Sequence, residues 1–381
     1  MKVYHKSFTF LLCLFQGYFS QGQDTFHNFG NVQVHNNGTI GFYSNLVNDG
    51  AFSESKGLVG FYNENQSLIS GAFSPFFYDL EIAVENHLFI DIPITVCNSL
   101  NFIYGDIKTT RNDKNVYVRL VKKSSYEGAV DLSKIDGHVA IEGQREFTFP
   151  IGNQAKLRPL GIRFIDGTFF AKCEYYYENP SNPESLYKSF DTSKKPISIG
   201  EINSKEFWSL TTSGIIQITL TWDAESDLSS KIDKLENVIV VGWSKNNEQW
   251  ENLGNTTIEG SPEKGKVSSN TFNANDYNIF TVGTLFELSD NMPGNYVITP
   301  NSDGANDNLI IKTTRQSPKN RIMIYDKTGK LVYEMSNYQD EFTGNANRES
   351  VTKILPEGTY FYLLELHDLN MRHQGYFYIK R

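Results

Sequence analysis

Short apolar strings separated by Gly- and Asn-rich turns recur at a nearly fixed spacing early in the chain. Residues 38–43 (GTIGFY) return as residues 57–62 (GLVGFY), nineteen positions further on, and residues 49–52 (DGAF) return as residues 70–73 (SGAF), twenty-one positions further on. A repeat of this length is typical of a β-solenoid, in which each coil buries its apolar face on the next. We therefore predict β-solenoid-like repeats over residues 23–108, with a meander of similar hairpins as the alternative. Three further strings fit the series, at residues 80–84, 88–92 and 100–105.

Longer strands of alternating polarity follow this repeat region. Polar turns separate them, and no stretch shows the 3.6-residue spacing of a helix. This pattern predicts a β-sandwich over residues 109–287. The strands that carry the prediction are at residues 116–121, 146–152, 215–222 and 238–243.

The last part of the chain, residues 288–381, has the pattern of a separate small unit. A polar loop at residues 299–307 leads into a short strand, and two strands within residues 321–334 are joined by a tight turn that suits Gly329. Two aromatic-rich strands follow, and the last one ends at Arg381. The pattern predicts a small Ig-like β-sandwich, so the whole chain is predicted to be all-β.

The first 22 residues have the pattern of a secretory signal peptide. Lys2 and Lys6 precede a run of about ten apolar residues, and a small residue at Ser20 and at Gly22 provides a cleavage site. A bilayer needs about 20 apolar residues, so we expect cleavage near Gly22 rather than a membrane anchor. No later segment is apolar over such a length, and we expect no transmembrane segment in the mature chain.

Charge and composition narrow the possible partners. The chain has 35 Lys and Arg against 44 Asp and Glu, a formal net charge of −9, and no basic block, which argues against nucleic-acid binding. Residues 290–381 hold 11 basic and 11 acidic residues, whereas residues 23–289 hold 22 basic and 33 acidic ones. The negative charge therefore belongs to the larger, N-terminal part. The 27 Phe and 21 Tyr residues favour strands throughout.

Candidate chemistry outside the last unit is sparse. We find no zinc-ligand spacing, nucleophile elbow or phosphate-binding loop, and the carboxylates are too many for a catalytic pair to be recognised. Cys97 and Cys173 lie in apolar or aromatic contexts and in segments predicted to belong to different domains, which favours two buried free thiols over a disulfide. The four Trp residues could form an exposed row that stacks on sugar rings, or they could lie in the hydrophobic core. Their apolar neighbours in the sequence favour the core. The four are Trp208, Trp222, Trp243 and Trp250.

Four motifs of the last unit occur in the order and spacing of a known family. The opening loop reads Thr-Pro-Asn-x-Asp-Gly-x-Asn-Asp, the hairpin contains Ile-Tyr-Asp-x-x-Gly, and Leu-Pro-x-Gly-Thr-Tyr and Gly-Tyr-x-Tyr-Ile-x-Arg follow. The unit resembles the gliding-motility-associated C-terminal domain, the type B sorting domain of the type IX secretion system of Bacteroidota. That family usually carries Trp-Asp-Gly where this chain has Phe-Thr-Gly at residues 342–344. The motif residues are Thr299, Pro300, Asn301, Asp303, Gly304, Asn306, Asp307, Gly329, Pro356, Gly358, Thr359, Tyr360, Gly375 and Arg381.

The resemblance implies a route of export. It implies passage to the periplasm by the signal peptide, then across the outer membrane by the type IX translocon, whose outer-membrane barrel receptor or shuttle reads the folded domain. The mature protein is then expected at the cell surface or outside the cell, associated with the outer membrane. The sorting domain itself is expected to have no catalytic activity.

For the rest of the chain we expect a non-enzymatic role. It would be a structural or adhesion component, or an accessory subunit of an outer-membrane complex or of a large gliding adhesin. The alternative is a secreted protein that binds or cleaves polysaccharide. No cofactor is expected. The oxygen-rich loop from Asn301 to Asp307 has side chains of the type that bind Ca²⁺, but it lacks the acids of an EF-hand, and such clusters are ordinary turn formers.

Overall fold

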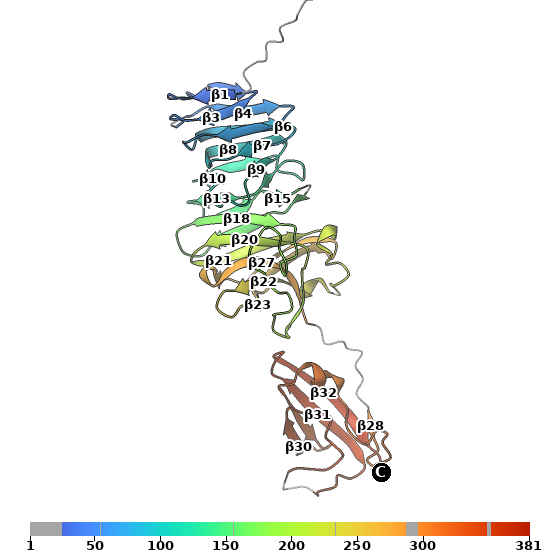
Figure 1. Ribbon diagram of the computed structural model, residues 1–381. Coiled ribbons are helices and arrows are strands. Elements are labelled where there is room, and N and C mark those ends of the chain that lie inside the picture. Colours follow the sequence, from blue (N-terminus) through green and yellow to red (C-terminus); the bar gives the residue numbers. More distant parts are fainter. Residues whose placement is uncertain (1–24, 54, 155, 233, 287–295, 349–351) are drawn as a thin grey trace, which may run out of the picture.

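The computed structural model describes residues 25–286, except 54, 155 and 233, and residues 296–381, except 349–351 (Figure 1). The predicted signal peptide lies outside these ranges. The described chain is nearly all β-structure, as predicted, and no helix in it is long and apolar enough to cross a membrane. Its helices are short 3-10 turns: η1 (Ala224–Ser226), η2 (Leu235–Asn237), η3 (Ala274–Asp276) and η4 (Lys312–Gln316).

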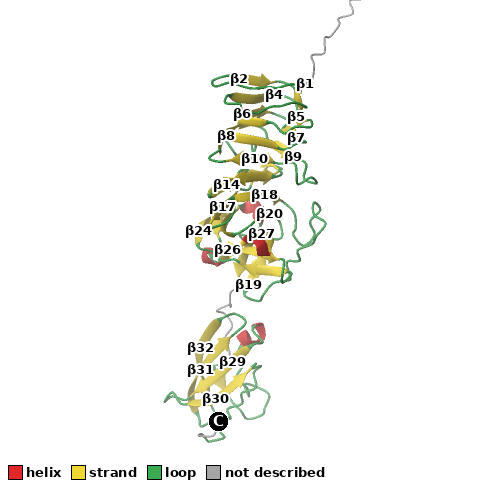
Figure 2. Cartoon of the chain, turned by 90° about the vertical axis from the view of Figure 1, so that its left-hand side faces the viewer, coloured by secondary structure: helices red, strands yellow, loops and turns green. Residues whose placement is uncertain are grey.

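Two columns of parallel strands form a β-solenoid of about six turns (Figure 2). The solenoid prediction is confirmed, and the meander is excluded because successive strands of each column pair in parallel. One column consists of β1 (Thr25–Asn28), β3 (Asn45–Asn48), β5 (Ser67–Ser70), β7 (Leu88–Ile90), β9 (Ile107–Thr109), β12 (Ile135–Asp136) and β15 (Ile151–Asn153). The other consists of β2 (Thr39–Phe42), β4 (Leu58–Asn63), β6 (Phe76–Val84), β8 (Ile94–Tyr104), β10 (Val118–Val121) and β13 (Val139–Glu142), with β11 (Ser125–Glu127) beside β8.

The Gly-Phe-Tyr repeat is explained by the register of the second column. Phe42 lies beside Phe61, and Phe61 lies beside Ile82, so that the three buried side chains form one continuous row of the core. On the outer face of the sheet, the Tyr62 ring lies against Gly60, where an added Cβ would come within 2.2 Å of it. The Phe thus fills the core while the Tyr covers the outer surface of a Gly, which is why these residues recur together.

The parallel stacking extends beyond the predicted boundary at residue 108. Strand β10 pairs in parallel with β13, and β12 and β15 continue the other column as far as Gly152. The sequence did not separate these turns from the sandwich, because buried Val118 and Leu120 alternate with less buried neighbours as they would in an antiparallel strand.

Glycines at the turns of the solenoid let one coil approach the next. Gly105 has φ of +84°, and a Cβ there would lie 1.8 Å from the carbonyl oxygen of Val84 in the preceding coil. Gly128 has φ of +75°, with the Phe102 carbonyl oxygen 2.1 Å from the same position. A side chain at either turn would therefore meet backbone rather than a movable side chain.

We expect Gly105→Ala to destabilise the solenoid more than Gly143→Ala. Both positions have positive φ, +84° and +78°, which costs an alanine about 1–2 kcal/mol. The added methyl of Gly143→Ala meets only the Lys122 side chain, at 3.2 Å, whereas that of Gly105→Ala meets backbone. Overpacking should add about 1–3 kcal/mol for Gly105→Ala alone. Urea unfolding of the mature protein measures both losses, and equal losses would contradict the role given to the close approach.

Beyond the last parallel turn, pairing becomes antiparallel and two sheets face each other. The sheet of β13 continues through β18 (Phe170–Tyr176), β20 (Phe207–Thr212), β27 (Tyr277–Leu285), β22 (Val238–Ser244) and β23 (Gln249–Asn252), with β19 (Ile199–Ile202) beside β27. The facing sheet consists of β14 (Glu146–Phe149), β17 (Leu160–Phe164), β21 (Ile215–Trp222), β25 (Lys264–Ser268) and β24 (Thr257–Ser261), with β26 (Phe272–Asn273) beside β21; β16 (Lys156–Leu157) pairs with β15. One hydrophobic core runs from Val34 in the solenoid to Val282 in β27, so the two parts form one packed body.

Residues 296–381 form a five-stranded sheet with its own core. Within the described ranges, none of its strands pairs with the other sheets. Buried Leu309, Ile311 and Phe342, which lie in loops, pack on one face of this sheet and supply its second layer. The strand order is β28 (Val297–Ile298), β32 (Met371–Ile379), β31 (Gly358–Leu366), β29 (Asn320–Tyr325) and β30 (Leu331–Ser336).

Candidate functional site

The sorting-motif loop at residues 299–307 is closed by its own side chains. The amide of Thr299 donates to the carbonyl of Asn306 at 2.7 Å, and Asp303 accepts a hydrogen bond from the amide two residues further on. Its carboxylates thus serve as turn formers, the role favoured from the sequence. The expectation of no cofactor, with Ca²⁺ at this loop as the alternative, stays a prediction. Asp307 accepts from three backbone amides, those of Asn301, Ser302 and Gly304.

Three of the four motifs meet around Arg381. Its guanidinium donates from Nε to the carbonyl of Leu355 at 3.1 Å and from Nη2 to the carbonyl of Gly344 at 3.2 Å. Pro300 of the opening loop also lies at this position, since a Cβ on Gly344 would be 3.2 Å from the Pro300 ring. Arg381 therefore ties the end of the last strand to the Leu-Pro turn and to Gly344, beside which the opening loop lies.

The other motif residues shape turns and strands. Gly329, in the hairpin, has φ of +82° and no atom within 4 Å of an added Cβ, so its conformation alone requires glycine. The Tyr360 hydroxyl donates to the carbonyl of Pro356 at 2.9 Å and closes the turn before β31. The remaining motif residues lie in the paired strands β31 and β32: they are Gly358, Thr359 and Gly375.

The departure from the family pattern at residues 342–344 preserves the packing of this region. Phe342 is fully buried and lies edge-on to Tyr333 and Phe377, with ring centroids 4.8 and 5.7 Å away. Gly344 has φ of +76°, a conformation that favours glycine. The aromatic and the glycine of the pattern are therefore kept for packing and for the turn, and only the carboxylate is missing, at Thr343.

One surface of the C-terminal unit carries exposed aromatic side chains. Phe361 and Tyr376 pair across β31 and β32 and are 47% and 59% exposed, and the Tyr296 ring lies 6.1 Å from that of Tyr376. Strand β32 pairs with β31 along its whole length but with β28 only at Tyr378 and Ile379. Among the described residues, the remaining length of that edge has no strand beside it. An aromatic surface beside an open edge is typical of sites for strand addition.

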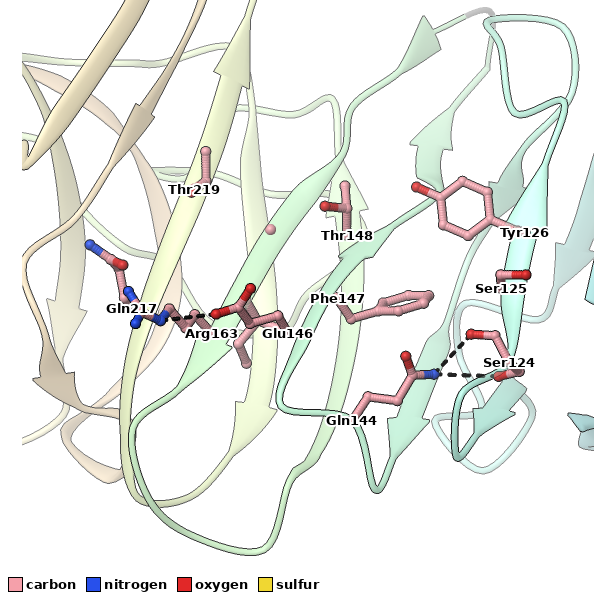
Figure 3. Close-up of a pocket in the computed structure, with 12 residues that line it drawn as sticks. Ser124, Ser125, Tyr126, Gln144, Glu146, Phe147, Thr148, Arg163, Gln217 and Thr219 are labelled. Carbon is pink, nitrogen blue, oxygen red and sulfur yellow. Dashed lines mark hydrogen bonds and ion pairs between the residues drawn. The ribbon is translucent and has the colours of Figure 1, made fainter. Parts of the chain in front are cut away.

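A groove of about 560 Å³ opens in the N-terminal body where the solenoid joins the sandwich (Figure 3). In the described chain, β11 pairs only with β8 and β14 pairs only with β17, and the groove lies between these two strands. Tyr126 and Phe147 form one wall, with ring centroids 5.8 Å apart, and the outer face of the β14–β17–β21 sheet forms the floor. Figure 3 shows the Tyr126 hydroxyl pointing across the groove toward Thr148.

Buried carboxylates in the same body are held by basic side chains. Glu206 is fully buried and accepts hydrogen bonds from Arg158 Nε at 3.0 Å and from the Tyr175 hydroxyl at 2.5 Å. Burial and the neighbouring Glu206 raise the pKa of Tyr175, so its hydroxyl remains a donor. The fully buried Lys134 likewise donates to Asp106 at 3.1 Å. Such pairs are strongly interdependent, because removing one partner leaves an uncompensated buried charge.

The exposure of the four Trp and two Cys side chains tests the predictions that they are buried. All four Trp side chains are at most 3% exposed, so their place in the core is confirmed and none offers a surface for sugars. Cys97 and Cys173 are free thiols, as predicted. Cys173 is buried, which raises its pKa well above the ordinary value, but the expectation of burial is wrong for Cys97, which is only half-buried.

In the small C-terminal unit the opening loop is closed by its own side chains, and three of the sequence motifs meet near Arg381. These are the features of a secretion-signal domain attached to a larger body. Residues 292–379 match the family of the CHU_C type IX secretion signal domain, which confirms the resemblance found in the motifs. The domain implies secretion by the type IX system, contact with its machinery, and delivery to the cell surface or the extracellular space. No curated protein and no solved structure matches the chain.

The groove residues were not found by sequence reasoning. They come from four segments that are far apart in the chain and that only the fold brings together: 124–126, 144–148, 161–163 and 217–219. Residues 146–152 were predicted as one strand, which is wrong: they form β14 in the sandwich sheet and β15 in the solenoid column, with Pro150 between the two. Nothing in their pattern showed that β14 would leave a groove beside β11.

Proposed function

We propose that the protein is a non-enzymatic component of the bacterial cell surface. In this proposal the body formed by residues 25–286 is a structural or adhesive module, and residues 296–381 direct it to the surface. The supporting observation is the attachment of a secretion-signal domain to a solenoid and sandwich that share one core. Coils stacked in this way make an extended body that presents side chains along its length. The excess of acidic residues in the body favours solubility and keeps it from adhering to anionic surfaces.

Two buried acids of the body are committed to structural ion pairs. A general acid or base must come within hydrogen-bond distance of a substrate. Glu206 and Asp106 are instead enclosed in the core and paired with Arg158 and Lys134. Asp106 and Lys134 lie beside β9 and β12 and suit a role in stabilising the solenoid. Glu206 and Arg158 lie beside β20 and β16 and suit residues that hold the solenoid and the sandwich together.

The exposed aromatic surface of the C-terminal unit supports a protein partner at the outer membrane. Exposed Phe361, Tyr376 and Tyr296 bring together aromatic side chains that are enriched at protein interfaces. We assign to this surface the contact with the translocon barrel during export, and then with an outer-membrane barrel or a large gliding adhesin.

Affinity capture from the producing bacterium tests this assignment. Intact cells carrying the tagged full-length protein are cross-linked, and the outer membrane is solubilised. We expect an outer-membrane barrel or a large adhesin to be recovered with it. Combined Phe361→Ser and Tyr376→Ser changes should reduce that recovery about tenfold, the effect of losing roughly 1.4 kcal/mol.

Lys380→Ser is the matched control, because Lys380 is exposed in the same unit but lies outside the aromatic surface. Its recovery of the partner should be unchanged. Recovery of the wild-type protein without any outer-membrane partner would contradict the proposal. Release of reducing ends from polysaccharide by the purified protein would contradict its non-enzymatic nature.

A further inference from the structure

We infer that the groove between β11 and β14 binds an uncharged oligosaccharide. The inference rests on the proposed adhesive role, to which it adds the chemical class of the ligand. A volume of about 560 Å³ is within the range of about 300–1,000 Å³ typical of ligand pockets. The tryptophans are buried, so any sugar surface of this body must be built from other side chains.

The aromatic wall suits the apolar face of a sugar ring. Tyr126 and Phe147 are each half-buried, with ring planes inclined by 71°, so the pair presents a corner of ring edge and ring face to the groove. Sugar C–H groups carry the partial positive charge that an aromatic face attracts. Burial raises the pKa of Tyr126, which keeps its hydroxyl protonated and able to donate a hydrogen bond to a sugar oxygen.

The floor of the groove is flat at its centre and polar on either side. Gly161 lies between Thr148 of β14 and Thr219 of β21 in the register of the sheet. A Cβ on Gly161 would be 3.2 Å from the Cβ of Thr219, so the absent side chain leaves backbone exposed between two hydroxyl groups. A sugar ring can lie on such a floor while its hydroxyls exchange hydrogen bonds with the two Thr side chains.

The charges of the groove cancel, which indicates an uncharged ligand. Glu146 and Arg163 are the only charged residues among those that line it, and they pair across β14 and β17 with Nε and Oε1 3.0 Å apart. Their side chains are 66% and 53% exposed, so a carboxylate acceptor and a guanidinium donor both face solvent. Sugar hydroxyls can use both groups, whereas an acidic polymer needs basic residues without acidic partners.

Isothermal titration of the mature full-length protein tests the inference. The probes are uncharged hexasaccharides of glucose, mannose and xylose, together with the acidic hexasaccharide of galacturonate. We expect at least one uncharged probe to bind with a Kd between about 10 μM and 1 mM, and the galacturonate probe to bind more weakly. Replacing the ion pair by Glu146→Ala with Arg163→Ala should weaken binding about tenfold or more, equivalent to roughly 1.4 kcal/mol.

The control replaces a similar exposed ion pair elsewhere on the same sheet. Lys266 and Glu259 pair across β24 and β25 with Nζ and Oε2 3.0 Å apart, and neither lines this groove. Combined Glu259→Ala and Lys266→Ala changes should leave the affinity unchanged.

A second groove variant, Thr148→Trp, should abolish binding by filling the site.

Three results would overturn the inference: no uncharged probe binds, the groove variants bind like the wild type, or galacturonate binds more tightly. Thermal unfolding of each variant shows whether a lost affinity reflects the site or the fold. This experiment uses purified protein and is independent of export. If no probe binds, the groove is not a sugar site. The proposed surface role would then still be tested separately, by the affinity-capture experiment.

Discussion

Deletion of residues 289–381 is expected to abolish delivery to the cell surface while leaving the remaining body folded. The two parts have separate hydrophobic cores, and within the described ranges no strand of one pairs with a strand of the other. The secretion-signal match lies wholly within the deleted segment. The truncated chain should therefore accumulate in the periplasm, protected from protease added to intact cells, whereas the full chain should be digested.

The reciprocal chimera controls for a general effect of truncation. A reporter protein placed between the signal peptide and residues 287–381 should become accessible to protease at the surface. Resistance of the truncated chain to limited proteolysis in periplasmic extracts would show that it has folded. Surface exposure of the truncated chain at the level of the full protein would contradict the role assigned to the C-terminal unit.

The sequence predicted the solenoid because its repeat combines a fixed spacing with a fixed chemistry. The coil needs an inward apolar residue such as Phe61 and a glycine such as Gly60 beneath a covering ring, and both recur. No corresponding sequence pattern marks the end of the solenoid. The strand that contains Leu120 has the same alternation whether its neighbours run parallel or antiparallel, so only the pairing in space places the last parallel strand at Gly152.

The C-terminal site was more predictable than the groove because its motifs are local. Gly329 is needed because its own backbone has positive φ, and Asp307 is needed because it accepts hydrogen bonds from amides a few residues away. Such short-range requirements can be recognised from the sequence pattern. Arg381 is different, because its partners Leu355 and Gly344 are 26 and 37 positions distant. The groove was harder to predict because its residues are distant in the chain: Tyr126 and Thr219 line it together only because β11 and β14, which belong to two different sheets, leave a space between them.

The buried charges of the body were also beyond sequence reasoning. Arg158 and Glu206 are 48 residues apart, and nothing in the pattern of either segment pairs them. The fold brings them together in the interior of the body, with Asp223 as a second partner of Arg158. Burial raises the pKa of Asp223, but the attraction of Arg158 and further hydrogen bonds outweigh it, so the pKa lies below the ordinary value and the carboxylate stays ionised.

Glu206→Ala is therefore expected to destabilise the body by about 3–5 kcal/mol, the range for removing one partner of a buried ion pair. The change leaves Arg158 with one carboxylate instead of two and leaves the Tyr175 hydroxyl without its acceptor. Urea unfolding of the mature protein measures the loss. Glu259→Gln, which removes the charge of an exposed partner of Lys266, should cost about 0–1 kcal/mol.

A double change separates the ion pair from the loss of side-chain volume. If Glu206→Ala acts by removing one of the two carboxylates that compensate Arg158, then combining Glu206→Leu with Arg158→Met should destabilise less than the sum of these two single changes, because both members of the buried pair are removed together. Additive losses would indicate that the two side chains contribute separately. A loss for Glu206→Ala no larger than that for Glu259→Gln would contradict the claim that this buried pair holds the solenoid and sandwich together.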